Sequence, residues 1–389
     1  MNASHISSSI VSNKLERRWV KLRVFRQLFR VFYDKTKNLF HTVRLLREVK
    51  KTYTRIFGDQ LITKIARVDN RYFWRLGAPG FPSMASYQMH KNEANHLVPT
   101  LPYSGQRSVL FAITKRCPLN CEHCFEWPNL SKSESLSQEE LIDIVHKYQR
   151  FGTTQMMFSG GEPMLRVTDV HAILKSAYAG TDFWIITSGL GLDDKRAQAL
   201  KSDGLTGVMV SLDHYDEESH DHFRGYSGSY QHAINALKSA KKVGLATTMA
   251  LCATKEFTTH ENLETYLELA KAIGVCFVQL IEPRASGRYK DQDVLLPSSQ
   301  TELLESFYLT YNSEPKFKEY PIINYLGYHQ RRVGCFGGGD RFFYIDTDGD
   351  AHLCPFCTGK LKNTLCNSPE QVIDTLQEHA CHSYSTHEN

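Results

Sequence analysis

Residues 108–127 read "SVLFAITKRCPLNCEHCFEW", an apolar run that passes directly into three cysteines, Cys117, Cys121 and Cys124. The first seven residues predict a short buried strand, because apolar and β-branched side chains follow one another there. The cysteines follow at gaps of three and then two residues, with no fourth cysteine nearby. A structural zinc site normally has four protein ligands. The stretch therefore predicts a strand that carries an incomplete set of thiol ligands at its carboxyl end.

Outward from this strand, further strand patterns alternate with helix patterns as far as residue 283. The strand patterns are 154–161, 182–189, 207–213, 246–254 and 276–283. The first helix pattern, 137–152, opens with the capping signal of Ser137 and Glu140. Such alternation predicts an α/β fold with a parallel sheet. We expect a partial, TIM-like (β/α)6 barrel that occupies residues 107–300.

Ligands of parallel sheets gather at the carboxyl ends of the strands. The groups that follow predicted strand ends are Cys117 and the stretches 159–163, 187–189 and 211–213, together with Glu282. Gly160 and Gly161 allow a ligand to approach the backbone closely, and Glu162 offers a carboxylate to an ammonium group. The alternative is a plain strand-to-helix turn at which Pro163 ends the strand. Asp213 and Glu282 suit a structural role as well as a chemical one, so no catalytic acid or base is assigned.

Three thiolates with an open fourth position suit an iron–sulfur cluster whose remaining iron binds a ligand from outside the protein. A zinc knuckle completed by His123 or a distant side chain is the alternative. Cys252 and Cys276 stand apart in apolar strand patterns, which is typical of buried core thiols.

The ordered motifs from about 107 to 290 resemble the radical S-adenosylmethionine (SAM) superfamily. The matching stretches are the three-cysteine motif with His123, "GGEP" at 160–163, "VSLD" at 210–213 and "HDHFRG" at 220–225. "ITSG" at 186–189 stands where the family often has Thr-Asn-Gly, with Ser188 in place of the asparagine.

The resemblance implies that SAM itself completes the 4Fe-4S cluster of Cys117, Cys121 and Cys124. One electron then cleaves SAM to methionine and a 5′-deoxyadenosyl radical, which abstracts hydrogen from an unactivated carbon. An electron donor such as flavodoxin or ferredoxin is implied as a partner. The residues implied to contact the cofactor are His123, Gly160, Gly161, Glu162, Pro163, Ser188, Ser211 and Arg224.

The C-terminal region, 301–389, resembles the SPASM and twitch extensions that bind auxiliary clusters. Cys335, thirteen residues, Gly349, four residues and Cys354 follow their spacing, and Cys357 departs from the simpler twitch form. The resemblance implies a second 4Fe-4S cluster on these three thiols, with Cys366 or Cys381 as the fourth ligand. A structural zinc site is the alternative. Asp348 and Gly349 also predict a β-hairpin turn in this region.

The N-terminal residues 1–58 form a basic segment with helical periodicity. Residues 14–55 contain fourteen Lys and Arg against three acids, whereas the whole chain carries a net charge of only +4. The apolar residues that recur at helical intervals are Leu22, Phe25, Phe29, Phe32, Leu39, Val43 and Leu46. This pattern predicts a helix on a membrane surface, a helix packed on its own domain or a site for nucleic acid. No nucleic-acid fingerprint accompanies the charge, so we expect no such partner.

Residues 59–106 are rich in Gly and Pro and predict an irregular linker or cap. No apolar run reaches the ~18 residues of a membrane span, and the start lacks the order of a secretory signal. We therefore expect a cytoplasmic enzyme, with a possible place at the inner face of the membrane through residues 14–55. Its substrate is expected to be a ribosomal peptide. The alternatives are a membrane-resident lipid, quinone or other small molecule and, outside enzymes, a zinc- or nucleic-acid-binding protein.

Overall fold

The computed structural model describes residues 8–58, 63–97 and 105–379. Its largest element is a sheet in the order β10-β9-β8-β7-β6-β5-β4-β11-β12. The six central strands pair in parallel in chain order, as the α/β prediction requires. Their bounds are β4 Ser108–Thr114, β5 Gln155–Gly160, β6 Asp182–Thr187, β7 Leu205–Ser211, β8 Ala246–Cys252 and β9 Phe277–Ile281. Within the described ranges β10 and β12 are the two edge strands of the sheet and do not pair with each other, so the barrel is partial and open.

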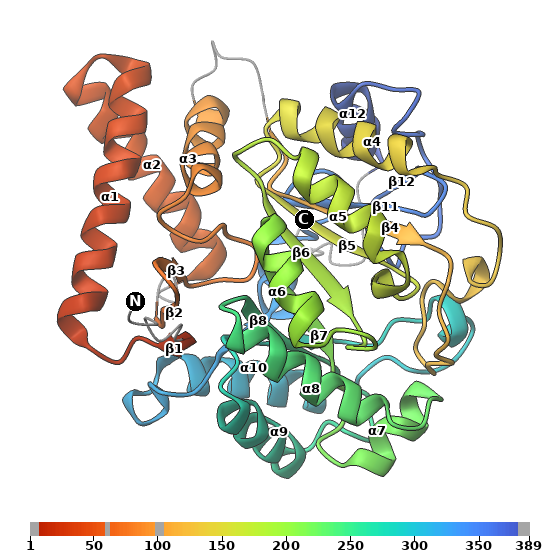
Figure 1. Ribbon diagram of the computed structural model, residues 1–389. Helices are drawn as coiled ribbons and strands as arrows, with labels where there is room; N and C mark the ends of the chain where they lie inside the picture. The colour runs from red at the N-terminus through yellow and green to blue at the C-terminus, as the bar shows by residue number, and fades with distance from the viewer. Residues whose placement is uncertain (1–7, 59–62, 98–104, 380–389) are drawn as a thin grey trace, which may run out of the picture.

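Helices cover one face of this sheet, and Figure 1 shows α4, α5, α6 and α8 in front of the strands. Ser137 caps α4 through the predicted capping box. The short helix α7 was not predicted from the sequence, because its eight mostly polar residues carry little periodicity. The bounds of the covering helices are α4 Gln138–Phe151, α5 Val167–Ser176, α6 Asp194–Asp203, α7 Glu217–Arg224, α8 Ser229–Lys242, α9 His260–Ile273 and α10 Ser298–Ser313.

The sequence predicts an irregular linker or a cap over 59–106, and the irregular linker is wrong for the described part of that segment. It contains β2 (Ala66–Val68), β3 (Arg71–Phe73) and the helix α3 (Met84–Leu97). Val68 and Phe73 pack with Trp184 and Phe277 on the face of the main sheet that the helices leave open. Glycine and proline mark tight turns around the two three-residue strands, and the buried side of α3 consists mostly of small or polar residues, so it shows no apolar stripe. The segment therefore fills part of the concave face of the barrel.

The basic N-terminal segment forms two helices, α1 (Lys14–Thr36) and α2 (Leu39–Phe57), beside the barrel (Figure 1). Lys37 has a φ of 49°, and Asn38 caps the second helix. The strand β1 (Ser8–Ile10) pairs with β2 in a small antiparallel sheet with β3. No helix in the described ranges is long and apolar enough to cross a membrane.

The C-terminal region continues the main sheet at both of its edges. The strand β10 (Ile322–Tyr325) pairs in parallel with β9, and β11 (Phe342–Ile345) pairs in parallel with β4. The predicted hairpin is confirmed, because β12 (Ala351–His352) pairs antiparallel with β11 across the turn at Gly349. The remaining helices are α11 Leu326–Val333 and α12 Pro369–Glu378. The exact boundaries of the four expected regions stay a prediction.

Candidate functional site

The predicted groups meet at one rim of the sheet, because the parallel strands β4 to β8 end there side by side. The amide of Gly161, after β5, donates to the carbonyl oxygen of Thr114 at the end of β4 (2.8 Å). The amide of Ser188, after β6, donates to Glu162 (2.8 Å). The amide of Cys252, at the end of β8, donates to Asp213 after β7 (2.8 Å). These hydrogen bonds tie the strand ends together around the three-cysteine loop.

The end of α7 holds the cysteine loop in place. The amide of Asn120 donates to the carbonyl oxygen of Arg224 (3.0 Å), and the amide of Glu122 donates to that of Phe223 (3.1 Å). Gly225, with a φ of 57°, lies so close that a Cβ atom would stand 2.8 Å from the carbonyl oxygen of Asn120. Glycine allows both the left-handed backbone and this close approach.

The thiols of the loop are largely shielded from water. Burial raises the pKa of Cys117 to about 11 and that of Cys124 to about 12, and Cys121 is only 9% exposed. The thiols of Cys117 and Cys124 therefore carry protons at neutral pH, and a metal group that binds there would have to displace those protons.

The loop supplies three thiols from Cys117, Cys121 and Cys124. A structural zinc site normally needs a fourth protein ligand, whereas an iron–sulfur cluster can leave one iron open to a ligand from outside the protein.

Glu162 is engaged by hydrogen bonds within the protein, and its predicted contact with an ammonium group stays a prediction. Its two oxygens accept hydrogen bonds from the amide of Met164 (3.0 Å), the hydroxyl of Thr187 (2.7 Å) and both the amide and the hydroxyl of Ser188 (2.8 and 2.5 Å). Burial raises the pKa of Glu162, although the hydrogen bonds from Ser188 and Thr187 oppose the shift. Glu162 thus joins the ends of β5 and β6.

Gly160 and Gly161 serve the packing of β5 against the cysteine loop. Gly160 has a φ of 118°, and a Cβ atom at Gly161 would stand 2.2 Å from the carbonyl oxygen of Arg116. Pro163 is buried at the start of the short 3-10 turn that follows. The sequence predicted close backbone approach at these glycines, and the structure shows that the backbone approached is the protein's own.

Arg224 lies buried beside the thiols, at 7% exposure. It forms an ion pair with Asp213 and donates to the sulfur of Cys121 (3.6 Å). Burial works to raise the pKa of Asp213, but the charges of Arg224, His123 and His220 outweigh it and hold that pKa below its usual value.

Three buried polar atoms near the rim have no hydrogen-bond partner among the described residues. They are Nδ1 of His123, Nε of Arg224 and the hydroxyl of Ser159. The His123 ring stacks on Phe223 at 4.9 Å, and burial lowers its pKa to about 4. Buried polar groups in proteins are normally paired. These three unpaired atoms therefore fit a polar ligand beside the thiols, such as SAM.

Arg288, in the loop after β9, is a site residue that sequence reasoning missed. Its guanidinium donates to the carbonyl oxygens of Asn120 (2.7 Å) and Cys121 (3.3 Å). It also lies over the ring of Trp127 at 4.0 Å. No motif marks this position, because an isolated arginine after a strand has no distinguishing pattern.

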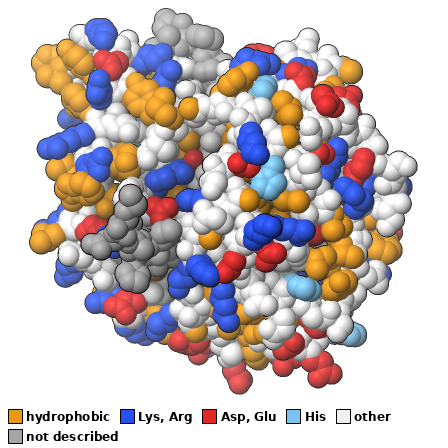
Figure 2. Space-filling view, viewed as in Figure 1, with side chains coloured by type: hydrophobic (Ala, Val, Ile, Leu, Met, Phe, Trp, Pro, Cys, Tyr) orange, Lys and Arg blue, Asp and Glu red, His pale blue; other side chains and the backbone are white. Residues whose placement is uncertain are grey.

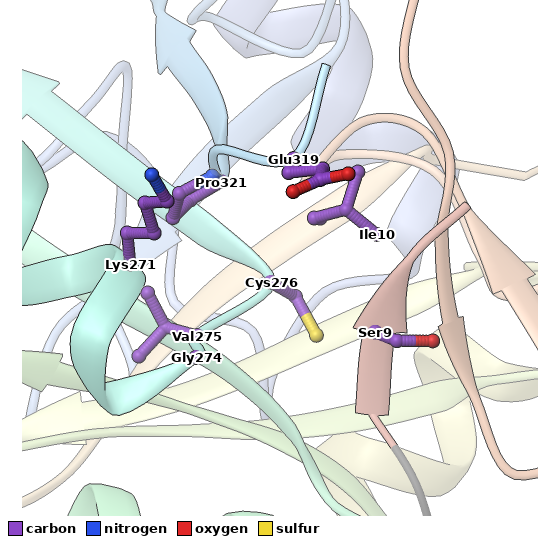
Figure 3. A pocket seen from close by; sticks show the side chains of 8 residues that line it. All are labelled: Ser9, Ile10, Lys271, Gly274, Val275, Cys276, Glu319 and Pro321. Carbon is purple, nitrogen blue, oxygen red and sulfur yellow. The ribbon is translucent and has the colours of Figure 1, made fainter. Parts of the chain in front are cut away.

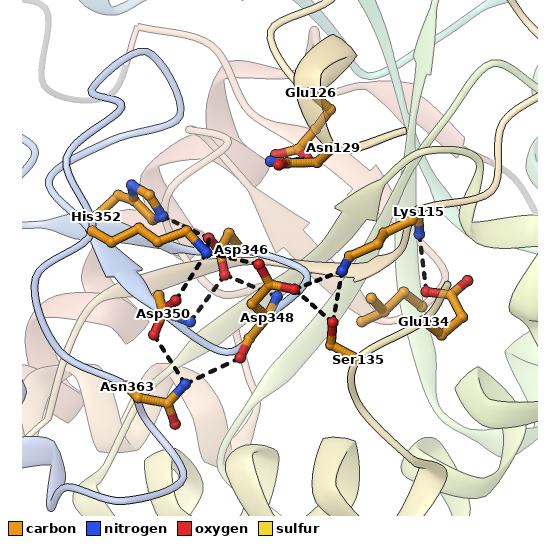
Figure 4. A network of polar contacts seen from close by, with 12 residues as sticks. Lys115, Glu126, Asn129, Glu134, Ser135, Asp346, Asp348, Asp350, His352 and Asn363 are labelled. Atoms are coloured by element: carbon orange, nitrogen blue, oxygen red, sulfur yellow. Dashed lines mark hydrogen bonds and ion pairs between the residues drawn. The ribbon is translucent and has the colours of Figure 1, made fainter. Parts of the chain in front are cut away.

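A polar network joins the cysteine loop to the C-terminal hairpin (Figure 4). Nζ of Lys115 donates to Asp348 and to Ser135, each at 2.6 Å. Nζ of Lys360 lies 3.1, 2.7 and 2.9 Å from oxygens of Asp346, Asp348 and Asp350, respectively. The ammonium group of Lys360 thus occupies the position that a metal ion would take among the three carboxylates.

The C-terminal cysteines lie partly together. The sulfurs of Cys354 and Cys357 are 3.3 Å apart, and Cys335 accepts a hydrogen bond from the amide of Gly337 (3.3 Å). A Cβ atom at Gly337 would stand 3.5 Å from the Cys335 sulfur and 3.4 Å from Cβ of Cys354, so these cysteines are neighbours. Cys366 is exposed, and Cys381 lies outside the described residues.

Two cavities have linings that contain none of the cysteines predicted to bind clusters. One of about 170 Å³ is lined by Ser9, Cys276 and Pro321 among others, and Cys276 precedes β9, opposite the rim (Figure 3). Another of about 450 Å³ opens at the rim beside Glu282. Glu282 pairs with Arg331 (2.6 Å) and so has a structural partner. Cys252 and Cys276 are buried in the core, as expected for unreactive thiols.

Comparison with known proteins places these features among relatives. Residues 111–270 match the model of the radical SAM superfamily. The chain is 30% identical over 253 residues to a PqqA peptide cyclase of Granulibacter bethesdensis, an alignment that covers 63% of this chain and 67% of the relative. It is 28% identical over 194 residues to an Fe-coproporphyrin III synthase of Methanosarcina barkeri, which covers 49% of this chain and about half (48%) of that enzyme.

Solved structures share the fold at lower identity. Streptococcus suis SuiB bound to its precursor peptide SuiA superposes with a TM-score of 0.58 at 14% identity, over 77% of this chain and 70% of SuiB. The enzyme anSMEcpe with bound AdoMet and a peptide superposes with a TM-score of 0.57 at 18% identity, over 72% of this chain and 84% of that enzyme.

Proposed function

Because this chain belongs to the radical SAM superfamily, we propose that it modifies a ribosomally made peptide by removing hydrogen from an unactivated carbon. It is an enzyme with a 4Fe-4S cluster and SAM as cofactors. When both are bound, the cluster would supply the electron that cleaves SAM. The observation that carries the proposal is the three-cysteine loop fixed at the rim, together with a curated relative that is named for a peptide substrate.

We assign the cluster to Cys117, Cys121 and Cys124, on the shielded loop. The SAM site would lie beside it, among the backbone of 160–163, Ser211 and the unpaired atoms of His123 and Arg224. Ser188 has its hydroxyl on Glu162, so its contribution would be to hold the ends of β5 and β6 in place. Arg224 would give a positive charge to a carboxylate ligand while Asp213 balances that charge.

We further propose a second 4Fe-4S cluster on Cys335, Cys354 and Cys357, completed by Cys366 or Cys381. The neighbouring positions of the first three thiols support it. Anaerobically reconstituted protein should then hold ~8 irons, and a variant with all three changed to Ala should hold ~4. Equal iron in both proteins, with zinc in the wild type, would favour a structural zinc site.

The electron donor would be a flavodoxin or ferredoxin. Arg116 and Lys132 flank the cysteine loop with exposed side chains and would attract such an acidic protein. Reduction by a flavodoxin should therefore slow at high salt, whereas reduction by dithionite should not.

The peptide assignment is tested with precursor peptides encoded beside the gene. The enzyme, SAM and dithionite are incubated with each peptide, and the product is analysed by mass spectrometry. We expect a peptide that has lost hydrogen or gained a cross-link, with 5′-deoxyadenosine formed in proportion. Cleavage of SAM that responds to a quinone or lipid and to no peptide would contradict the assignment and favour a membrane-resident substrate.

We also propose that the enzyme sits at the inner face of the cytoplasmic membrane through α1 and α2. Their buried side contains Val31, Phe32 and Leu45, which hold the two helices together. Their outer side exposes Leu15, Trp19, Leu22, Phe25, Tyr33, Leu39, Phe40 and Val43. Figure 2 shows hydrophobic side chains and Lys and Arg side by side over this part of the molecule. Aromatic and leucine side chains suit the headgroup boundary, and each cation near an anionic surface contributes ~1 kcal/mol.

Vesicle co-sedimentation tests the membrane contact. Wild-type protein should bind anionic vesicles at low salt and lose part of the binding at high salt. Trp19→Ser, Phe25→Ser and Phe40→Ser together should abolish it. A matched control changes Leu165, Tyr178 and Leu295 to Ser, three exposed apolar residues elsewhere. Failure of the wild type to bind, or equal loss in the control, would contradict the membrane contact.

A further inference from the structure

The two groups of cysteines are in contact through aromatic residues that directly neighbour them in the chain. Phe125 follows Cys124, and Phe356 precedes Cys357. The two rings meet edge to face, with centroids 6.0 Å apart and an interplanar angle of 74°. Phe125 meets Tyr344 of β11 in the same manner, at 5.8 Å and 82°. We call these three residues the aromatic wall: Phe125, Tyr344 and Phe356.

Polar contacts fasten both sides of the aromatic wall. The hydroxyl of Tyr344 donates to the carboxylate of Glu126, which is 3% exposed. The ring of His352 lies 5.7 Å from that of Tyr344, and its Nδ1 is 3.1 Å from the carbonyl oxygen of Cys357. Figure 4 shows His352 within the ion-pair network of the hairpin, joined to Asp346, and Glu126 above that network. The loop of Cys117, Cys121 and Cys124 is therefore connected to the C-terminal cysteines through directly packed aromatic side chains.

We propose that the aromatic wall is a positioning device, through which metal bound at the C-terminal thiols orders the loop of Cys117, Cys121 and Cys124. The inference rests on the proposed function, because it requires that the loop cysteines and the C-terminal cysteines each bind metal. It requires no particular substrate. Phe125, Tyr344 and Phe356 act through the loop and do not touch the reacting atoms.

The physical reason is that contacts with neighbouring elements hold both segments, and neither lies inside a helix or a sheet. Apart from the short turn Trp127–Asn129, residues 115–131 form no regular element, and neither do residues 353–366. A metal group that joins Cys335, Cys354 and Cys357 would remove conformational freedom from the second segment. Phe356 would then be fixed, and its edge-to-face contact would restrict Phe125 and the adjoining Cys124. The same contact would limit access of water to the cluster on that side.

The test compares three variants, reconstituted anaerobically as full-length protein with iron and sulfide. Phe356→Ala removes one ring of the wall, and because this ring is 37% exposed the variant should fold. Phe356→Tyr keeps the ring. Leu361→Ala is the matched control, because this partly buried residue of the same segment packs on the main core. Iron content, hydrogen exchange of amides 119–130 and the reduction potential of the first cluster are measured without peptide.

At full iron content, Phe356→Ala should exchange these amides several-fold to about tenfold faster than wild type. The reduction potential should shift upward, because added water stabilises the more negative reduced state. Phe356→Tyr should match wild type in both measurements, and so should Leu361→Ala. Unchanged exchange and potential in Phe356→Ala, or an equal effect of Leu361→Ala, would overturn the proposal. If the variants differ as expected in exchange and potential while no peptide is modified, the aromatic wall stands and only the proposed peptide substrate is contradicted.

Discussion

At the scale of single residues, the rim depends on charges that are buried and paired. Arg224 and Asp213 are 7% and 5% exposed, and each would be costly to bury alone. Removing one partner of such a pair is strongly destabilising, because the other charge stays behind without compensation.

Asp213→Ala should therefore lower the free energy of unfolding by about 3–5 kcal/mol. Asp293→Ala is a matched control, because Asp293 is 91% exposed in its pair with Lys255 and should contribute less than about 1 kcal/mol. Urea unfolding of the metal-free proteins measures both. A similar loss of unfolding free energy in the two variants would show that burial of the Asp213–Arg224 pair does not determine its contribution to stability.

The same pair sets a pH dependence. The pKa of Asp213 is held below its usual value in the folded protein, so the folded state binds its proton less readily than the unfolded chain does. Its contribution is thus present above the unfolded pKa of about 3.9 and is lost as the pH falls through the lower folded pKa. The stability difference between wild type and Asp213→Ala should persist at neutral pH and shrink only in acid.

Arg288→Ala tests a residue that no sequence motif marks. The change removes the hydrogen bonds to Asn120 and Cys121 and the contact with Trp127, so the loop should hold its iron less firmly. We expect faster loss of iron to a chelator, with Arg288→Lys intermediate because lysine lacks the planar fork of donors. Wild-type iron retention in Arg288→Ala would show that α7 alone holds the loop.

At the scale of elements, the end of β5 and the cysteine loop are too close for any side chain between them. Gly161→Ala should push them apart, since its Cβ atom would meet the backbone of Arg116. We expect the variant to fold but to bind iron poorly at the first site. Gly77→Ala is the control, because no atom lies within 4 Å of its Cβ position. Full iron content in Gly161→Ala would contradict this account of the glycines.

The six central strands could be predicted because each is an apolar run that a helix pattern follows. The strands β2 and β3 could not be predicted, since strands of three residues show no period. The helix α3 could not be predicted either, because it buries mostly small or polar side chains. The pairing of β11 with β4 was also out of reach, because it joins residues more than 200 positions apart. Local patterns in a sequence specify elements, whereas distant packing specifies which strands are neighbours.

The candidate site likewise contains residues that could be predicted from the sequence and contacts that could not. The three cysteines and the glycine run were visible because their chemistry lies in short motifs. The engagement of Glu162 by Thr187 and Ser188 was not visible, because it depends on how two strand ends meet. The aromatic wall was missed for the same reason, since its residues lie in three separate segments.

At the scale of the whole molecule, a partial barrel has additions at both ends of its chain. The N-terminal helices α1 and α2 stand beside it and present an exposed apolar and basic face (Figures 1 and 2). The C-terminal hairpin extends the sheet next to the strand that carries the three-cysteine loop. This arrangement brings the C-terminal cysteines next to the three-cysteine loop, and the end of α2 packs against Phe336, which follows Cys335.

The most direct test of the central claim is the formation of 5′-deoxyadenosine. Reconstituted wild-type protein, its Cys124→Ala variant and its Cys252→Ala variant are each incubated anaerobically with SAM and dithionite, and the products are measured by chromatography. Cys252 is a buried cysteine outside the loop and serves as the control. The account predicts 5′-deoxyadenosine and methionine from the wild type and from Cys252→Ala, and none from Cys124→Ala. Formation at the wild-type rate by Cys124→Ala, or none by iron-loaded wild type, would contradict it.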